Sequence, residues 1–175
     1  LDATGSVTLG ALSGAGNDLT VEGSSASLGN VSNVGALSVD APATLTGTSY
    51  AAGSMDFSGA VTLTGDTTLD TSGANGDIAV ASVAGAGNDL TVNAGTGNTS
   101  LGNVAAVGAL DVDGTSTLTG TSYAANSETF GGAVTLTGDT TLDASGALTV
   151  ASVSGAGNDL TLDGSSIALG NVANV

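Results

Sequence analysis

The chain has 175 residues, 16 acidic side chains and no Lys, Arg or His, so its formal net charge is −16. Phosphate backbones and anionic bilayers recruit Lys and Arg, so this composition excludes a nucleic-acid partner and argues against direct membrane insertion. Cys is also absent, which excludes disulfides and thiolate metal sites. No apolar run approaches the ~18 residues that a membrane-spanning helix needs.

In chain order, the sequence divides into long repeats, and we expect them to form one continuous domain over residues 1–175. Its parts are the tail of a preceding repeat (1–12), repeat 1 (13–83), repeat 2 (84–153) and the start of repeat 3 (154–175). The strongest match is Ala60–Asp70, which returns unchanged as Ala133–Asp143, 73 positions later (133 − 60). Such repetition is typical of repeat architectures. Because residue 1 falls inside a repeat, we expect a segment of a longer array.

A series of aliphatic residues, each followed closely by Gly, divides the long repeats into short steps. The series is Leu12, Leu28, Leu45, Leu63, Val83, Leu101, Leu118, Leu136, Val153 and Leu169. Four steps make one long repeat of about 70 residues (83 − 12 = 71; 153 − 83 = 70). Steps of roughly 16–20 residues are too short for a crossover helix and fit one coil of a β-solenoid.

The predicted fold is therefore an all-β parallel β-solenoid of about nine coils, four per long repeat of about 70–73 residues. Alternation in Val61-Thr-Leu63-Thr places apolar and polar side chains on opposite faces. We expect the aliphatic series to form one inward column, each member stacked on the next. The four aromatic residues, spaced four steps apart in pairs, are expected to fill the core, with an exposed contact as the alternative. They are Tyr50, Phe57, Tyr123 and Phe130.

Tandem coils of this size, rich in Gly corners and poor in Cys and basic residues, resemble the filamentous-haemagglutinin-like exoproteins and autotransporter passengers of Gram-negative bacteria. The resemblance covers the whole chain in period and composition. It implies a right-handed parallel β-helix, an extracellular location at the bacterial cell surface, and a role as the shaft of an adhesin or fibre, as in biofilms.

One corner motif could bind calcium. Ser13-Gly-Ala-Gly-Asn-Asp18-Leu-Thr20-Val is similar to the calcium-binding nonapeptide Gly-Gly-x-Gly-x-Asp-x-apolar-x, but Ser13 replaces Gly and Thr20 takes the apolar position. The motif occurs once per long repeat, whereas calcium sites of this kind need tandem nonapeptides. A Gly-rich turn is the favoured reading. A calcium site would use Asp18, Asp89 and Asp159; no other cofactor is expected.

Other motifs give little support for catalysis. Carboxylates pair at Asp66 and Asp70, Asp111 and Asp113, Asp139 and Asp143, and Asp159 and Asp163. Such a pair could hydrolyse a glycoside, but these carboxylates recur with the repeat, as corner residues would, and few aromatic rings are available to position a sugar. No Ser has a His or Lys partner, which excludes a triad.

The Thr-Leu-Thr segments do not indicate an ice-binding surface. They are too interrupted along the chain to form a continuous Thr array, and they reflect the preference of Thr for β-strands.

The sequence thus predicts a structural shaft and not an enzyme. Its expected partners are further coils of the same array or other copies stacked end to end. The alternative is a binding module whose solenoid face holds polysaccharide or divalent cations.

Overall fold

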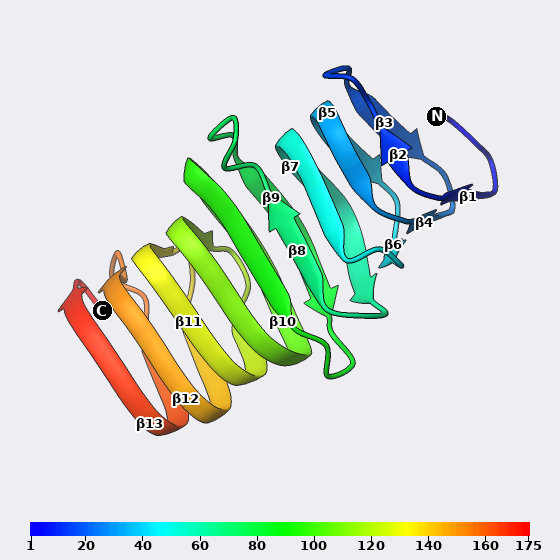
Figure 1. The fold of residues 1–175 in the computed structure, drawn as a ribbon. Helices are drawn as coiled ribbons and strands as arrows, with labels where there is room; N and C mark the ends of the chain where they lie inside the picture. Colours follow the sequence, from blue (N-terminus) through cyan, green and yellow to red (C-terminus); the bar gives the residue numbers. More distant parts are fainter.

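The computed structural model describes residues 1–175 and confirms the predicted parallel β-solenoid. All of its elements are strands, joined in one sheet by parallel pairing. Figure 1 shows the turns stacked along one axis, with the two chain ends at opposite ends of the stack. No helix is present that could cross a bilayer. The strands are β1 (Ser6–Leu9), β2 (Leu12–Ser13), β3 (Leu19–Glu22), β4 (Ser25–Leu28), β5 (Val31–Asp40), β6 (Ala43–Leu45), β7 (Ser49–Leu63), β8 (Thr67–Asp70), β9 (Ile78–Ala84), β10 (Leu90–Leu118), β11 (Ser122–Leu136), β12 (Thr140–Ser154) and β13 (Leu160–Ala173).

Strand formation follows from the two-residue alternation of the sequence. At the end of β7, Val61 and Leu63 are buried while Thr62 and Thr64 are exposed, as the pleat of a strand requires. The β-branched Val and Thr residues suit this half-buried surface. The later strands run on through the corners, and β10 alone covers 29 residues. The corners therefore bend the ladder without interrupting it.

Strand pairing fixes how the turns stack. One inward column can be followed from end to end, each member pairing with the next: Val7, Ala26, Ala43, Val61, Val83, Val104, Tyr123, Leu142 and Leu162. These nine residues mark nine turns, in agreement with the expected number. The turns differ in length, since Leu28 pairs with Leu45 but Thr67 pairs with Leu90. The second of these turns is longer than any step predicted from the sequence.

The predicted single column is wrong in register but right in orientation. Leu45 stacks on Leu28, and Leu63 on Leu45, but Val83 pairs with Val61 instead of Leu63. All eight members of the aliphatic series from Leu28 to Val153 are nevertheless buried. Leu12 in the first turns is half-buried, and Leu169 is 40% exposed because it lies on the last turn, where no further turn covers it.

The register error has a geometric cause: a long repeat is shorter than four turns. Four turns from Val61 end at Leu142 by successive pairing, which is a sequence offset of 81 (142 − 61). The sequence itself repeats at an offset of 73 (133 − 60), which is smaller by eight (81 − 73). One long repeat therefore spans fewer than the four coils expected from the sequence. Equivalent residues of the two repeats have the same local neighbours but lie on different sides of the shaft.

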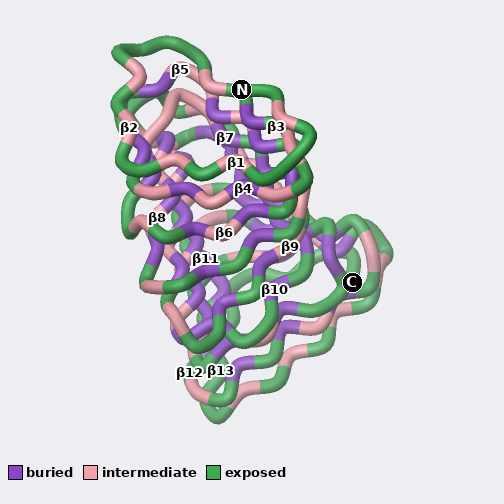
Figure 2. Tube along the Cα trace, turned by 90° about the vertical axis from the view of Figure 1, so that its right-hand side faces the viewer, coloured by how far each residue is buried: buried purple, intermediate pink, exposed green.

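The core is a continuous row of aliphatic side chains along the shaft axis. It contains 38 buried hydrophobic residues in one cluster. Figure 2 colours the buried residues purple along the chain trace. Each turn contacts only its neighbours, so the core extends in one dimension. Close stacking of backbones requires Gly at some corners: a Cβ on Gly76 would clash with the carbonyl of Gly53, and one on Gly102 with that of Ala81.

Candidate functional site

The proposed calcium corners are tight turns stabilised by Asn and Asp side chains. At the first corner, Ala15 and Gly16 both have positive φ (52° and 81°), and Asn17 donates its backbone and side-chain N–H groups to the carbonyl of Gly14 (3.0 and 2.9 Å). Positive φ costs Ala about 1–2 kcal/mol. The Asn side chain offsets part of this cost by closing the turn. The same Asn bonds recur at Asn88 and Asn158.

Two of the three predicted calcium ligands bind the backbone of the next turn. Asp18 accepts a hydrogen bond from the amide of Ala36 (2.8 Å), and Asp89 accepts one from Ala109 (2.7 Å). The amide of Asp159 donates to the carboxylate of Asp139 (2.9 Å). The structure brings together no group of three or more His, Cys, Asp or Glu side chains able to hold a metal ion. Calcium binding at these corners stays a prediction.

Three of the other predicted carboxylates, those of Asp66, Asp70 and Asp139, also serve as acceptors within the shaft. Asp66 accepts from the amide of Asp89 (3.0 Å), and Asp70 from the amide and hydroxyl of Ser72 (2.8 and 2.6 Å). Burial, and then the charge of Asp113, raise the pKa of Asp111. Charge-assisted bonds of this type fix corners, which gives the acidic residues a structural role without any cation.

Corner Asn residues act in the same way. Asn30 accepts hydrogen bonds from the amides of Thr48 (2.7 Å) and Ser49 (3.2 Å) in the next turn. Asn103 repeats the arrangement with Thr121 and Ser122 at the same distances. Each Asn therefore satisfies two backbone donors that a bent ladder leaves unpaired.

The aromatic residues fill the core, as expected. The Tyr50 hydroxyl donates to the carbonyl of Leu28 (2.6 Å) and accepts from the amide of Gly47 (3.0 Å), and Tyr123 makes the equivalent bonds to Leu101 and Gly120. Burial raises the pKa of both Tyr hydroxyls. Tyr123 also meets the Phe130 ring edge-to-face, with centroids 6.5 Å apart. None of these rings is available at the surface to bind a sugar.

Glu128 is a functional candidate that the sequence reasoning missed. Its side chain is 1% exposed, and neither carboxylate oxygen has a hydrogen-bond partner. On the adjacent turns it pairs with Leu110 and Leu148. Burial, and then the charge of Asp143, raise its pKa to about 8. The nearby backbone amide of Asp143 partly offsets this rise, although it does not meet hydrogen-bond geometry. A signal was present: Glu128 lies two residues before Phe130, so alternation places both side chains inward.

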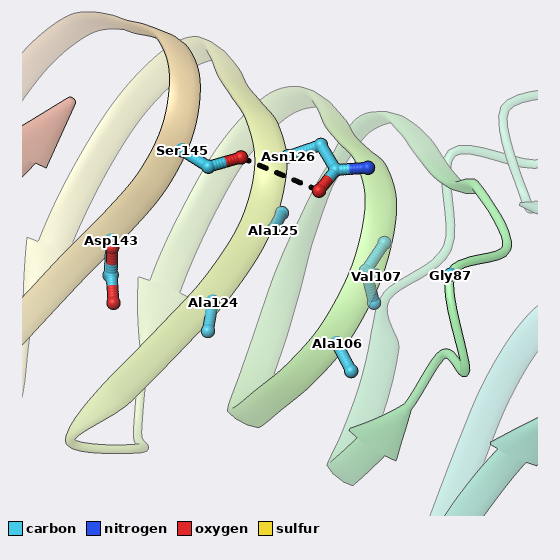
Figure 3. Close-up of a pocket in the computed structure, with 8 residues that line it drawn as sticks. All are labelled: Gly87, Ala106, Val107, Ala124, Ala125, Asn126, Asp143 and Ser145. Atoms are coloured by element: carbon cyan, nitrogen blue, oxygen red, sulfur yellow. Dashed lines mark hydrogen bonds between the residues drawn. The ribbon is translucent and has the colours of Figure 1, made fainter. Parts of the chain in front are cut away.

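Two grooves are the most concave parts of the surface, and neither was predicted. The first-repeat groove, of about 320 Å³, is lined by Asn33, Val34, Ala51, Ala52, Gly53, Asp70, Gly73 and Ala74. The second-repeat groove, of about 310 Å³ and drawn in Figure 3, is lined by Gly87, Ala106, Val107, Ala124, Ala125, Asn126, Asp143 and Ser145.

The two grooves are copies of one feature. Six lining residues of one correspond to six of the other at the shift of 73 positions that relates the repeats: Asn33 to Ala106, Val34 to Val107, Ala51 to Ala124, Ala52 to Ala125, Gly53 to Asn126, and Asp70 to Asp143. Both lie at bulges of the ladder, where the pairing register shifts after Val31 and after Val104. A bulge bends the strand, and the small side chains beside it leave the surface hollow.

The two grooves differ in the hydrogen bonds that their Asp carboxylate accepts. Asp70 in the first-repeat groove is bound by Ser72, whereas the side chain of Asp143 in the second-repeat groove makes no hydrogen bond with the protein. In addition, Asn126 stands where the first repeat has Gly53, and its side-chain oxygen accepts a bond from Ser145 (3.4 Å), drawn in Figure 3. The second-repeat groove therefore differs from the first in having a carboxylate that is free of hydrogen bonds from the protein.

No protein-family model, curated protein or solved structure matches this chain.

Proposed function

We propose that this chain is a shaft segment of a large extracellular bacterial surface fibre or adhesin, which works by display and assembly and not by catalysis. The observation that carries the proposal is the uninterrupted ladder of nine paired turns. A stack in which each turn contacts only its neighbours can be lengthened without altering its core. The extracellular and adhesive parts rest on the resemblance in period and composition described above.

The amino-acid composition supports a structural role. Without His, Lys, Arg or Cys, the chain has no conventional base for a Ser nucleophile, and its Tyr side chains are in the core. Several corner Asp and Asn side chains bond to the next turn, as described for Asp18 and Asn30. These polar groups support the stack from outside while the aliphatic column supports it from inside.

The partners that fit this role are further turns of the array or other copies of the chain. On the last turn, Ile167, Leu169 and Val172 are 45%, 40% and 39% exposed, and the outer edge of β13 has no strand beside it. An open, apolar strand edge pairs readily with another chain. A second copy stacked on this edge would continue the ladder at about 4.8 Å per turn.

End-to-end stacking can be tested with two variants of equal charge. Leu169→Asp with Val172→Asp places two carboxylates on the apolar end face and should abolish stacking, while Ala168→Asp with Asn171→Asp adds the same charge on exposed neighbours of the same turn. Light scattering and electron microscopy at moderate salt should show filaments for the parent chain and the control. Monomers in all three samples, together with saturable binding of a glycan or calcium, would favour the rival hypothesis of a binding module.

A further inference from the structure

The carboxylate of Asp143 has no counterion or hydrogen-bond partner in the protein. Asp18, Asp66, Asp70 and Asp89 all accept bonds from backbone or Ser groups, but Asp143 accepts none although it lines a groove. The chain contains no Lys, Arg or His. Its only other cation, the N-terminal amine, donates to the carbonyl of Thr20 (2.6 Å) in the first turns. A cation that pairs with Asp143 must therefore come from outside these 175 residues.

The rest of the second-repeat groove is suited to an aliphatic stem. The turn next to Asp143 carries Ala124 and Ala125, and the turn beyond it carries Ala106 and Val107, as Figure 3 shows. Ala106 and Ala124 present the accessible methyl groups, because Val107 and Ala125 are nearly buried. Successive turns are about 4.8 Å apart, so the apolar part of the groove is long enough for a chain of several methylenes. Its volume of about 310 Å³ exceeds that of a single ion. An aliphatic chain laid here would bury its CH₂ groups against methyl groups.

A second acidic group lies close to Asp143. Glu128 is buried and unpartnered, and the two carboxylates are near enough for their charges to interact. The first repeat has Met55 at the equivalent position. The second repeat thus combines a free carboxylate at the surface with a buried carboxyl group beside it, and a cation at Asp143 would offset the charge that helps to raise the pKa of Glu128.

We propose that the second-repeat groove binds a lysine side chain of a partner protein, with the ammonium group at Asp143 and the aliphatic stem along Ala106 and Ala124. Another copy of this chain cannot supply the ligand, because it has no Lys. The inference does not depend on the shaft function. The first-repeat groove is the weaker site, because Ser72 already occupies the carboxylate of Asp70.

The position of the grooves on the shaft determines in which directions successive binding sites face. The sequence offset of one long repeat is smaller by eight than that of four turns (81 − 73), so successive grooves lie on different sides of the shaft. Successive repeats would then present lysine sites around the fibre and not along one line. Individually weak contacts of this kind gain strength from multivalency where a partner can reach several of them.

The experiment is an NMR titration of the full chain with two neutral-capped peptides, acetyl-Ala-Lys-Ala-amide and acetyl-Ala-norleucine-Ala-amide. The lysine peptide should give saturable shifts at Ala106, Ala124 and Ala125 with a millimolar dissociation constant, and the norleucine peptide should give none. Asp143→Asn should weaken binding at least tenfold. Asp113→Asn removes the same charge from an exposed position outside the groove, and Asp70→Asn removes it from the other groove; both should bind as the parent does.

A second readout separates site binding from general screening. Because the charge of Asp143 helps to raise the pKa of Glu128, bound ammonium should lower that pKa, as followed by the side-chain ¹³C signal of Glu128. In Asp143→Asn the pKa should already be lower, and the peptide should not change it further. Uniform, non-saturating shifts, equal binding of the norleucine peptide, or tighter binding of calcium or of free 1,5-diaminopentane than of the lysine peptide would overturn the proposal.

Discussion

The two long repeats have nearly the same local structure but different core chemistry. Their Tyr hydroxyl bonds have the same lengths, 2.6 and 3.0 Å, in both copies. Three buried positions are apolar in the first repeat and polar in the second: Ala26, Ala43 and Met55 correspond to Thr99, Ser116 and Glu128. None of the three polar side chains of the second repeat has a hydrogen-bond partner. The backbone ladder therefore tolerates polar groups in the core that contribute no bonds of their own.

This comparison shows which interactions define the fold. The repeated corner bonds and aliphatic columns are enough to define the turns, because the second repeat keeps them despite three unpartnered polar groups. Unpartnered buried polar groups cost free energy, about 1–3 kcal/mol each and more for a charge. We therefore expect the second repeat to be the less stable part of the shaft, and the following substitutions test that expectation.

The largest expected effect comes from giving the second repeat the core of the first. The triple substitution Thr99→Ala, Ser116→Ala and Glu128→Met should raise the free energy of unfolding at pH 8 by about 3–6 kcal/mol. Urea denaturation followed by circular dichroism measures the change. The reverse substitutions in the first repeat, Ala26→Thr, Ala43→Ser and Met55→Glu, should lower the free energy of unfolding. A neutral or destabilising triple variant would show that the three side chains stabilise one another.

The next effect is the pH dependence of stability that Glu128 contributes. Its folded-state pKa of about 8 lies above the ordinary 4.5, so the folded chain holds a proton that the unfolded chain releases. Its stabilising contribution is complete below pH 4.5 and is lost as the pH rises through 8. The free energy of unfolding should fall by about 3 kcal/mol between pH 4.5 and 7, at about 1.36 kcal/mol per pH unit.

Glu128→Met isolates this effect from the other carboxylates. The difference between parent and variant, measured by thermal unfolding at several pH values and constant ionic strength, should grow with pH from 4.5 to 8. Asp143 is the charged group whose interaction with Glu128 raises its pKa, so Asp143→Asn should move the midpoint of this dependence to lower pH. A difference that does not change with pH would mean that Glu128 is not protonated in the folded chain.

A smaller effect tests whether the two repeats are equivalent in their hydrogen bonds. Tyr50→Phe and Tyr123→Phe each remove a hydroxyl that bonds to one carbonyl and one amide. Each should cost about 1–2 kcal/mol, because the buried backbone groups lose a partner. The two costs should be equal within experimental error in urea denaturation. A clearly smaller cost at Tyr123 would indicate that the second repeat can relax around the missing bond.

The smallest effect is expected at the exposed face of the identical segments Ala60–Asp70 and Ala133–Asp143. Thr62→Asp and Thr135→Asp place a carboxylate at matching exposed positions and should each change the free energy of unfolding by about 0.5 kcal/mol or less. Leu101→Asp is the contrasting variant, because Leu101 is fully buried and a buried, unpaired charge should cost several kcal/mol. Similar melting temperatures for the Thr62 and Leu101 variants would contradict the inside–outside assignment.

Much of the candidate site could not be predicted from the sequence. The corner motif correctly placed Asp18 and Asp89 in Gly-rich turns, but their bonds to Ala36 and Ala109 come from the next turn and are not local in sequence. The inward orientation of Glu128 was readable from its spacing to Phe130. Its lack of a partner was not, because that depends on what Leu110 and Leu148 bring beside it.

The sequence by itself determined the repeat, the strands and the side of each strand that faces the core, because period-two alternation is a local property of the backbone. Only the tertiary structure decided which turn stacks on which. Corners of different length add up along the chain, so that Val83 meets Val61 and not Leu63. Backbone pairing between residues as distant in sequence as Thr67 and Leu90 sets this register, and with it the grooves and the neighbours of Asp143.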